Sequence, residues 1–164
     1  MYNANDVWLD ISIARQHLWL RRGDDVLFQA PVSTAANGPG ERMNSECTPR
    51  GRHRIRAKIG AGCPVNTVFV GRRPTGEIYS PALARDYPGR DWILTRILWL
   101  SGLEAGRNRL GDVDTMRRYI YIHGTPATTA LGKPGSRGCV RMANDDIIRL
   151  FDVIPAGALV VIDG

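Results

Sequence analysis

The chain has 164 residues, of which 43% are hydrophobic, and it carries a formal net charge of +6 at neutral pH. A chain of this length can bury one core without disulfides or metals, so we expect a single domain over residues 1–164. The composition excludes a disordered chain. No apolar run approaches the roughly 18 residues of a membrane-spanning helix, so we expect no membrane span.

The positive charge comes almost entirely from arginine, because only Lys58 and Lys133 are lysines. Guanidinium groups bind carboxylates and phosphates in a fork geometry, so an anionic partner fits this composition. A solvated basic surface fits it equally well. No recognition motif or aromatic-rich basic stripe accompanies the charge, and we expect no nucleic-acid partner.

The N-terminal part of the chain has the pattern of short strands. Residues 7–13 alternate apolar and polar side chains with a period of two, which predicts a strand. Two further runs within 17–33 flank a polar turn and predict a hairpin. A loop rich in Gly, Asn and Pro covers 34–51, and a basic strand is predicted at 52–59, with His53 expected at the surface.

The C-terminal part adds three strands at 66–72, 91–100 and 116–124, although the run 91–100 also fits a buried helix. A helix is predicted at 144–154, and a last strand follows at 158–162. These elements together predict a mainly-β sandwich or barrel with one helix.

Two details of these C-terminal elements bear on function. In the run 116–124, alternation places Tyr119, Tyr121 and His123 on one face of the strand and two isoleucines on the core face. In the helix, Asn144 is the predicted N-cap, because its side chain can accept from a free amide of the first turn.

The chain has three cysteines, Cys47, Cys63 and Cys139, so a monomer has at least one free thiol. Cys47 and Cys63 can pair only if their Cα atoms approach within about 7 Å, which the sequence leaves open. Their spacing with His53 lacks the short separations of common zinc sites, so we expect no metal.

A histidine and a cysteine with distinctive neighbours form the candidate site. The Gly124 carbonyl can accept the Nδ1 proton of His123, and Gly138 allows a sharp turn in which its own amide and that of Cys139 form an oxyanion hole. Adjacent arginines and a protonated His123 would lower the pKa of the thiol. The alternative is structural, since a lone strand-end His and a lone Cys often only pack.

The segments "HGTP" and "SRGCVRM", with a spacer rich in Gly and Pro between them, resemble the signature of the L,D-transpeptidase catalytic domain family of the YkuD type. The opening hairpin and the "TPRG" segment are similar to that family too. The resemblance covers residues 7–57 and 116–162 and is loose between them. It implies an L,D-transpeptidase-like β-sandwich or barrel with a short helix after the cysteine.

The resemblance implies a role for each matching residue. Cys139 corresponds to the nucleophile, His123 to the base oriented by the Gly124 carbonyl, and Gly138 to part of the oxyanion hole. Such enzymes attack the L,D amide of a peptidoglycan stem peptide, hold an acyl-thioester and pass the acyl group to an amine of a second stem, without a cofactor or metal. An L,D-carboxypeptidase that uses water, and a noncatalytic wall-binding protein, are the alternatives. Carbapenems are the expected covalent inhibitors.

The chain departs from the family pattern at two positions. Arg137 stands where many members have a second histidine, and Arg141 stands where asparagine is usual. Because arginine cannot shuttle a proton, we expect both to bind substrate carboxylates, with simple packing as the alternative. Tyr121 and Ser136 are further candidate substrate contacts, with sheet packing and turn support as their alternatives.

The substrate implied by the resemblance lies outside the cytoplasmic membrane, so the expected location is the periplasm or cell envelope. The first residues, "MYNANDVWLD", lack the basic and apolar regions of a secretory signal, so we expect a longer precursor or another export route. We expect a monomer.

Overall fold

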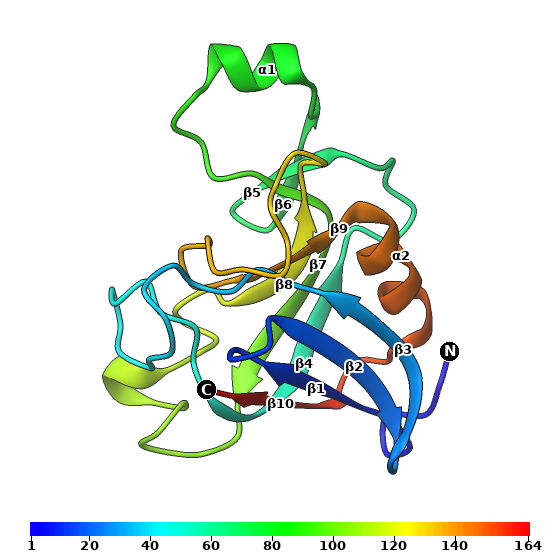
Figure 1. The fold of residues 1–164 in the computed structure, drawn as a ribbon, viewed down its shortest axis with the longest axis vertical. Helices are drawn as coiled ribbons and strands as arrows, with labels where there is room; N and C mark the ends of the chain where they lie inside the picture. The colour runs from blue at the N-terminus through cyan, green and yellow to red at the C-terminus, as the bar shows by residue number, and fades with distance from the viewer.

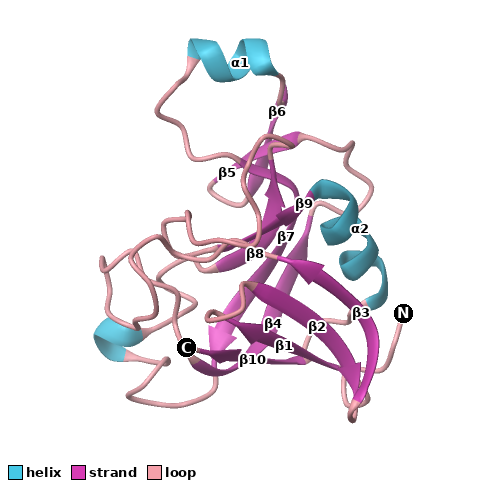
Figure 2. Ribbon diagram, in the orientation of Figure 1, coloured by secondary structure: helices cyan, strands magenta, loops and turns pink.

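A computed structural model describes all 164 residues. Its alternating segments form ten strands of one strongly curled sheet (Figures 1 and 2). The strands are β1 (Trp8–Ser12), β2 (His17–Arg22), β3 (Asp25–Pro31), β4 (Gly51–Ile59), β5 (Thr67–Val70), β6 (Arg73–Ile78), β7 (Ile93–Gly102), β8 (Tyr121–Thr125), β9 (Val140–Ala143) and β10 (Leu159–Asp163). The predicted mainly-β fold is confirmed.

The sheet runs in the order β3-β2-β1-β10-β4-β7-β5-β6. Outside this order, β8 pairs with β7, and β9 pairs with β8. Most pairs are antiparallel, but β1 pairs with β10 and β8 pairs with β9 in parallel. Figure 1 shows β1, β2, β3 and β10 at one end of the molecule and β5 and β6 at the other. Strand β7 is central because it pairs with β4, β5 and β8.

The main core lies inside the curl of the sheet. The inward positions of β1, in the predicted period-two strand 7–13, and of β2, in the predicted hairpin 17–33, are fully buried there. The run 91–100 belongs to a strand and not to a helix, and its Leu98 and Leu100 join the same core. No helix of the structure is long and apolar enough to cross a membrane.

Helix α2 (Asn144–Val153) confirms the predicted helix and contacts β7, β8 and β9. The predicted N-cap is wrong, because Asn144 is already helical and Ala143 precedes the helix without a side-chain cap. Asn144 bonds elsewhere: its Oδ1 accepts from Thr95 Oγ1 at 2.6 Å and its Nδ2 donates to Asn66 Oδ1 at 2.9 Å. The side chain therefore ties the helix start to the sheet.

The chain before β8 differs from the prediction. Residues 115–119 form a turn, in which Tyr119 has a φ of 57° and Asp114 Oδ1 accepts from the Arg117 amide. Tyr119 thus does not share the strand face with Tyr121, and its side chain is 52% exposed. The turn competes with strand pairing because its backbone amides are satisfied locally.

Three further features were not predicted: strand β6, helix α1 (Pro81–Asp86) and a 3₁₀ turn η1 at Gly111–Val113. Ser80 Oγ caps α1 by accepting from the Leu83 amide at 3.1 Å. The helix buries none of its residues and stands away from the rest of the sheet (Figure 1).

His53 is fully buried, so its predicted surface position is wrong. Its Nδ1 bonds the Gly51 carbonyl at 3.1 Å and its Nε2 bonds Thr115 Oγ1 at 3.0 Å. Burial lowers its pKa to about 4, so the ring is neutral at neutral pH. The cysteines are all free thiols, which answers the question of a Cys47–Cys63 pair.

Candidate active site

The parallel pair of β8 and β9 brings His123 and Cys139 onto one face of the sheet. His123 lies opposite Arg141 and Ile122 opposite Val140, so Cys139 enters β9 beside Tyr121. The opposite face of the same strands holds Ile122 and Val140 in the core. His123 is one pleat repeat from Tyr121, about 7 Å along the strand. The spacer between the two signature segments thus forms the loop that returns the chain for parallel pairing.

The imidazole of His123 is buried and oriented by its neighbour. Nδ1 donates to the Gly124 carbonyl at 2.6 Å, as predicted, which leaves Nε2 with the lone pair. Only glycine fits at Gly124, because a Cβ there would collide with Asn144 Oδ1 and the Leu94 carbonyl. Desolvation lowers the pKa of His123 below its usual 6.5, so the ring is neutral at neutral pH.

Cys139 is partly exposed, and its sulfur is held by two backbone groups. Sγ donates to the Tyr119 carbonyl at 3.4 Å and accepts from the Tyr121 amide at 3.3 Å. Desolvation raises the pKa of the thiol to about 12, against smaller opposing effects of the Tyr121 amide, Arg141 and Arg118. The predicted lowering is therefore wrong for the resting site, and His123 is not an imidazolium.

The turn before Cys139 is held by a hydroxyl on each side. Gly138 has a φ of 128°, which favours glycine, and its carbonyl accepts from Thr48 Oγ1 at 2.8 Å. Ser136 Oγ donates to the Cys139 carbonyl at 2.6 Å and accepts from the Gly138 amide at 3.2 Å. The Gly138 amide is thus occupied, contrary to the predicted oxyanion hole, whereas the Cys139 amide has no protein partner.

Cys139 opens onto a cleft of about 490 Å³. Its walls come from the β5–β6 turn, the starts of β7 and β8 with the residues before them, and the cysteine loop. The lining residues are Gly71, Arg72, Asp91, Ile93, Tyr119, Tyr121, Arg137 and Cys139. The Tyr121 hydroxyl accepts from Arg72 Nη1 at 3.0 Å. His123 does not line this cleft and is 1% exposed. No hydrogen bond joins it to Cys139 in this resting site, and such bonds often tighten only with substrate.

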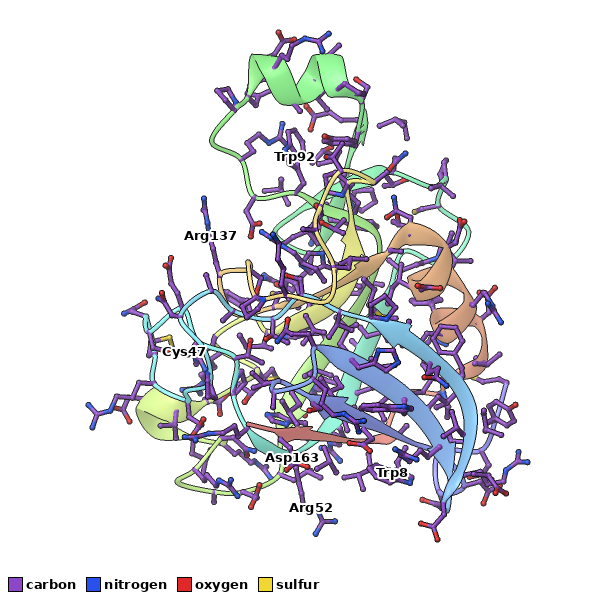
Figure 3. All side chains as sticks on the ribbon, in the orientation of Figure 1. Trp8, Cys47, Arg52, Trp92, Arg137 and Asp163 are labelled. Atoms are coloured by element: carbon purple, nitrogen blue, oxygen red, sulfur yellow. The ribbon has the colours of Figure 1, made fainter.

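The predicted substrate contacts differ in their availability. Arg137 is exposed, has no ion-pair partner and extends away from the ribbon (Figure 3). Arg141 is engaged, because Nη2 pairs with Asp91 Oδ1 at 3.0 Å and Nη1 donates to the Gly135 carbonyl at 3.1 Å. Ser136 is 4% exposed and supports the turn. Of the two arginines, Arg137 is the one whose guanidinium group is free to bind a ligand.

A family model described as the L,D-transpeptidase catalytic domain, YkuD, matches residues 6–162. The chain belongs to this family. The match includes residues 58–115, where the sequence resemblance was loose.

A relative has a name that agrees with this membership, and two solved structures share the fold. A Bacillus subtilis protein named "Putative L,D-transpeptidase YkuD" is 40% identical over 90 residues, which are 55% of this chain and 44% of that protein. L,D-transpeptidase 3 from Mycobacterium tuberculosis, solved with a faropenem-derived adduct, aligns with a TM-score of 0.57 at 15% identity, over 97% of this chain and 60% of the other. LdtMt1, solved in complex with imipenem, aligns with a TM-score of 0.58 at 18% identity, over 96% of this chain and 59% of the other. The chain thus spans less than two thirds of each, and the structures show the shared fold.

Three charged residues of this L,D-transpeptidase domain were missed from the sequence. Arg72 stacks over Tyr119 at 4.4 Å from the ring centroid, Asp91 pairs with Arg141, and Arg118 donates to the Cys47 carbonyl at 2.7 Å. The "GRR" and "DYPGRD" segments that hold Arg72 and Asp91 have only turn signals. Their place beside Cys139 comes from strand pairing, which no local pattern reveals.

Proposed function

We propose that this domain is a cysteine-dependent L,D-transpeptidase that acts on peptidoglycan stem peptides. The observation that carries the proposal is a thiol at a cleft wall with a neutral, carbonyl-oriented imidazole on the neighbouring parallel strand. A nucleophile paired with an oriented base is the arrangement of covalent acyl transfer. Membership of the family supports the substrate class.

In the proposed first step, Nε2 of His123 takes the thiol proton as Cys139 Sγ bonds to the carbonyl carbon of the L,D amide. The free amide of Cys139 is placed to donate to the developing oxyanion. The C–N bond then breaks, and the proton on His123 passes to the leaving amine of the terminal D-amino acid. The product is an acyl-thioester on Cys139.

In the second step, an acceptor amine attacks the thioester carbonyl and Cys139 leaves as the thiol. His123 takes a proton from the amine and returns it to sulfur, so the enzyme is regenerated. With water as acceptor the same chemistry gives an L,D-carboxypeptidase. The acceptor therefore decides between cross-linking and trimming.

Purified sacculi treated with the protein test this choice. Muropeptides are released and analysed by mass spectrometry, with Cys139→Ala as the inactive control. Transpeptidation predicts new cross-linked dimers, whereas trimmed monomers alone would replace it with carboxypeptidation. No change in either product would contradict the proposed function.

We propose that Arg137 binds a free carboxylate of the stem peptide. It is exposed on the Cys139 cleft, and it is not among the groups that shift the thiol pKa. Arg137→Gln should leave the thiol pKa unchanged and raise KM about tenfold or more for a carboxylate-bearing stem. Arg73→Gln, an exposed arginine outside the cleft, is the charge-matched control.

A neutral-amide stem supplies the second comparison for Arg137. Its kinetics should be the same with wild type and Arg137→Gln. Equal slowing of both stems, together with a raised thiol pKa, would assign Arg137 to sulfur activation instead. Unchanged kinetics for both would leave it as a surface residue.

Two further proposals follow from this function. Carbapenems should acylate Cys139, since imipenem occupies a domain of the same fold. The working location should be the periplasm or cell envelope, because the stem peptides are there. Fractionation of cells that express the native protein tests the location, and confinement to the cytosol would contradict it.

A further inference from the structure

Strand β4 directs a row of arginines to solvent. Its alternating residues place His53 and Ile55 in the interior and Arg52, Arg54 and Arg56 on the exposed side. Arg52 projects outward from its end of the sheet (Figure 3). Like charges in a row repel one another. Without a bound counter-ion, this row therefore adds nothing to the stability of the folded protein.

The segment after β7 adds two more arginines to that row and encloses a hollow of about 210 Å³. Arg109 and Arg117 line it together with Arg54 and Arg56. None of these four guanidinium groups forms an ion pair or a hydrogen bond within the protein. The remaining lining residues are Ser101, Gly102, Leu110, Asp114 and Met116.

The polar residues of the hollow leave the four cations unsatisfied. Asp114 is the single carboxylate, and its two oxygens accept from the Leu110 amide at 2.7 Å and the Arg117 amide at 2.9 Å. Asp114 therefore shapes the loop and pairs with no guanidinium. Ser101 Oγ is shielded from solvent and has no hydrogen-bond partner within the protein, so it does not neutralise the charge of the hollow.

We propose that this arginine hollow, lined by Arg54, Arg56, Arg109 and Arg117, is a binding site for a phosphate group, as a monoester or a diester. Guanidinium forks match phosphate oxygens bidentately, and several converging on one hollow provide more donors than a carboxylate can accept. The hollow shares no lining residue with the Cys139 cleft, so the site is separate from the proposed catalytic one. The inference does not depend on the proposed acyl transfer.

Isothermal titration with inorganic pyrophosphate at fixed ionic strength tests the site. The double variant Arg54→Gln/Arg109→Gln should bind pyrophosphate about tenfold or more weakly than wild type. Arg15→Gln/Arg85→Gln removes the same charge at exposed positions outside the hollow and should bind within about twofold of wild type. Circular dichroism melts establish that each variant is folded.

Vesicles distinguish the source of the phosphate group. Phosphatidylglycerol vesicles that bind wild type, but neither the hollow variant nor a phosphatidylcholine control, would identify a lipid headgroup. Pyrophosphate binding without vesicle binding would identify a soluble or polymeric phosphate, and both results support the site.

Three results would overturn it. The first is that wild type does not bind pyrophosphate, and the second is that the two double variants lose the same affinity. The third is that Arg137→Gln loses affinity and the hollow variant does not, which would place the anion in the catalytic cleft.

Discussion

At the scale of single residues, the resting site holds two neutral partners. The pKa of His123 lies below 6.5 and that of Cys139 is raised to about 12, both through desolvation. If the proposed acyl transfer holds, we expect proton transfer from sulfur to Nε2 to accompany attack and not to precede it.

The first prediction concerns the pH dependence of acylation. Because neither His123 nor Cys139 titrates between pH 7 and 9, the acylation rate should be flat across that range. With a free thiol of pKa about 8.5, the acylation rate would instead rise roughly tenfold for each pH unit up to about pH 8.5. Stopped-flow acylation by imipenem measures the profile, and a tenfold rise from pH 7 to 8 would refute the neutral pair.

His123 provides a second prediction at this scale. Loss of the base should slow acylation by about 10²- to 10⁴-fold in His123→Ala, since general-base assistance typically contributes that much. His17→Ala, a histidine on β2 outside the cleft, is the control and should match wild type. A change below about threefold in His123→Ala would reassign the residue to a structural role.

The sequence predicted the local backbone geometry of the site better than its electrostatics. The Gly124 carbonyl and the glycine at 138 follow from local geometry, so adjacent residues were sufficient to predict them. The pKa of Cys139 depends on burial by segments far away in the chain, and the predicted activation by Arg137 failed for that reason. The occupied Gly138 amide likewise depends on the Ser136 rotamer.

At the scale of elements, Thr48 joins the early loop to the cysteine turn. Its buried Oγ1 accepts from the Ala35 amide at 3.0 Å and donates to the Gly138 carbonyl at 2.8 Å. Thr48→Val keeps the shape and leaves two buried backbone groups without partners. The free energy of unfolding should fall by about 2 kcal/mol.

Urea denaturation measures this loss, with Thr75→Val on exposed strand β6 as the control, expected within about 0.5 kcal/mol of wild type. A Thr48→Val variant as stable as that control would show that the hydroxyl does not hold the turn.

Element prediction succeeded where periodicity is strong, as in β1, β2 and α2. It failed at β6 and α1, whose residues have turn signals and bury little or nothing. The run 91–100 was ambiguous because periodicity cannot separate a buried helix from a strand. Its three strand partners decide the outcome, and pairing between distant segments has no signature in one sequence.

At the scale of the whole molecule, buried His53 couples folding to pH. The pKa of His53 is about 4 in the folded protein, and the value for the unfolded chain is taken as 6.5. Between these pH values the unfolded chain therefore binds more protons than the folded one. Stability should therefore be complete above about pH 6.5 and fall as the pH drops to about 4, by on the order of 3 kcal/mol from this residue.

Urea denaturation of His53→Asn between pH 4 and 7 tests this coupling, because asparagine retains the bond to the Gly51 carbonyl but does not titrate. The variant should lose less stability than wild type as the pH falls. His17→Asn on β2 is the control and should retain the wild-type slope. Parallel curves for wild type and His53→Asn would exclude the contribution.

Intact-mass spectrometry of the protein mixed with a stem-peptide donor tests the proposed acyl transfer most directly. The predicted result is a mass increase equal to the donor acyl group, mapped to Cys139, absent in Cys139→Ala and retained in Cys47→Ala and Cys63→Ala. Circular dichroism of Cys139→Ala should match wild type, because the sulfur bonds only backbone groups. An adduct on Cys47 or Cys63, or turnover by Cys139→Ala, would contradict the account.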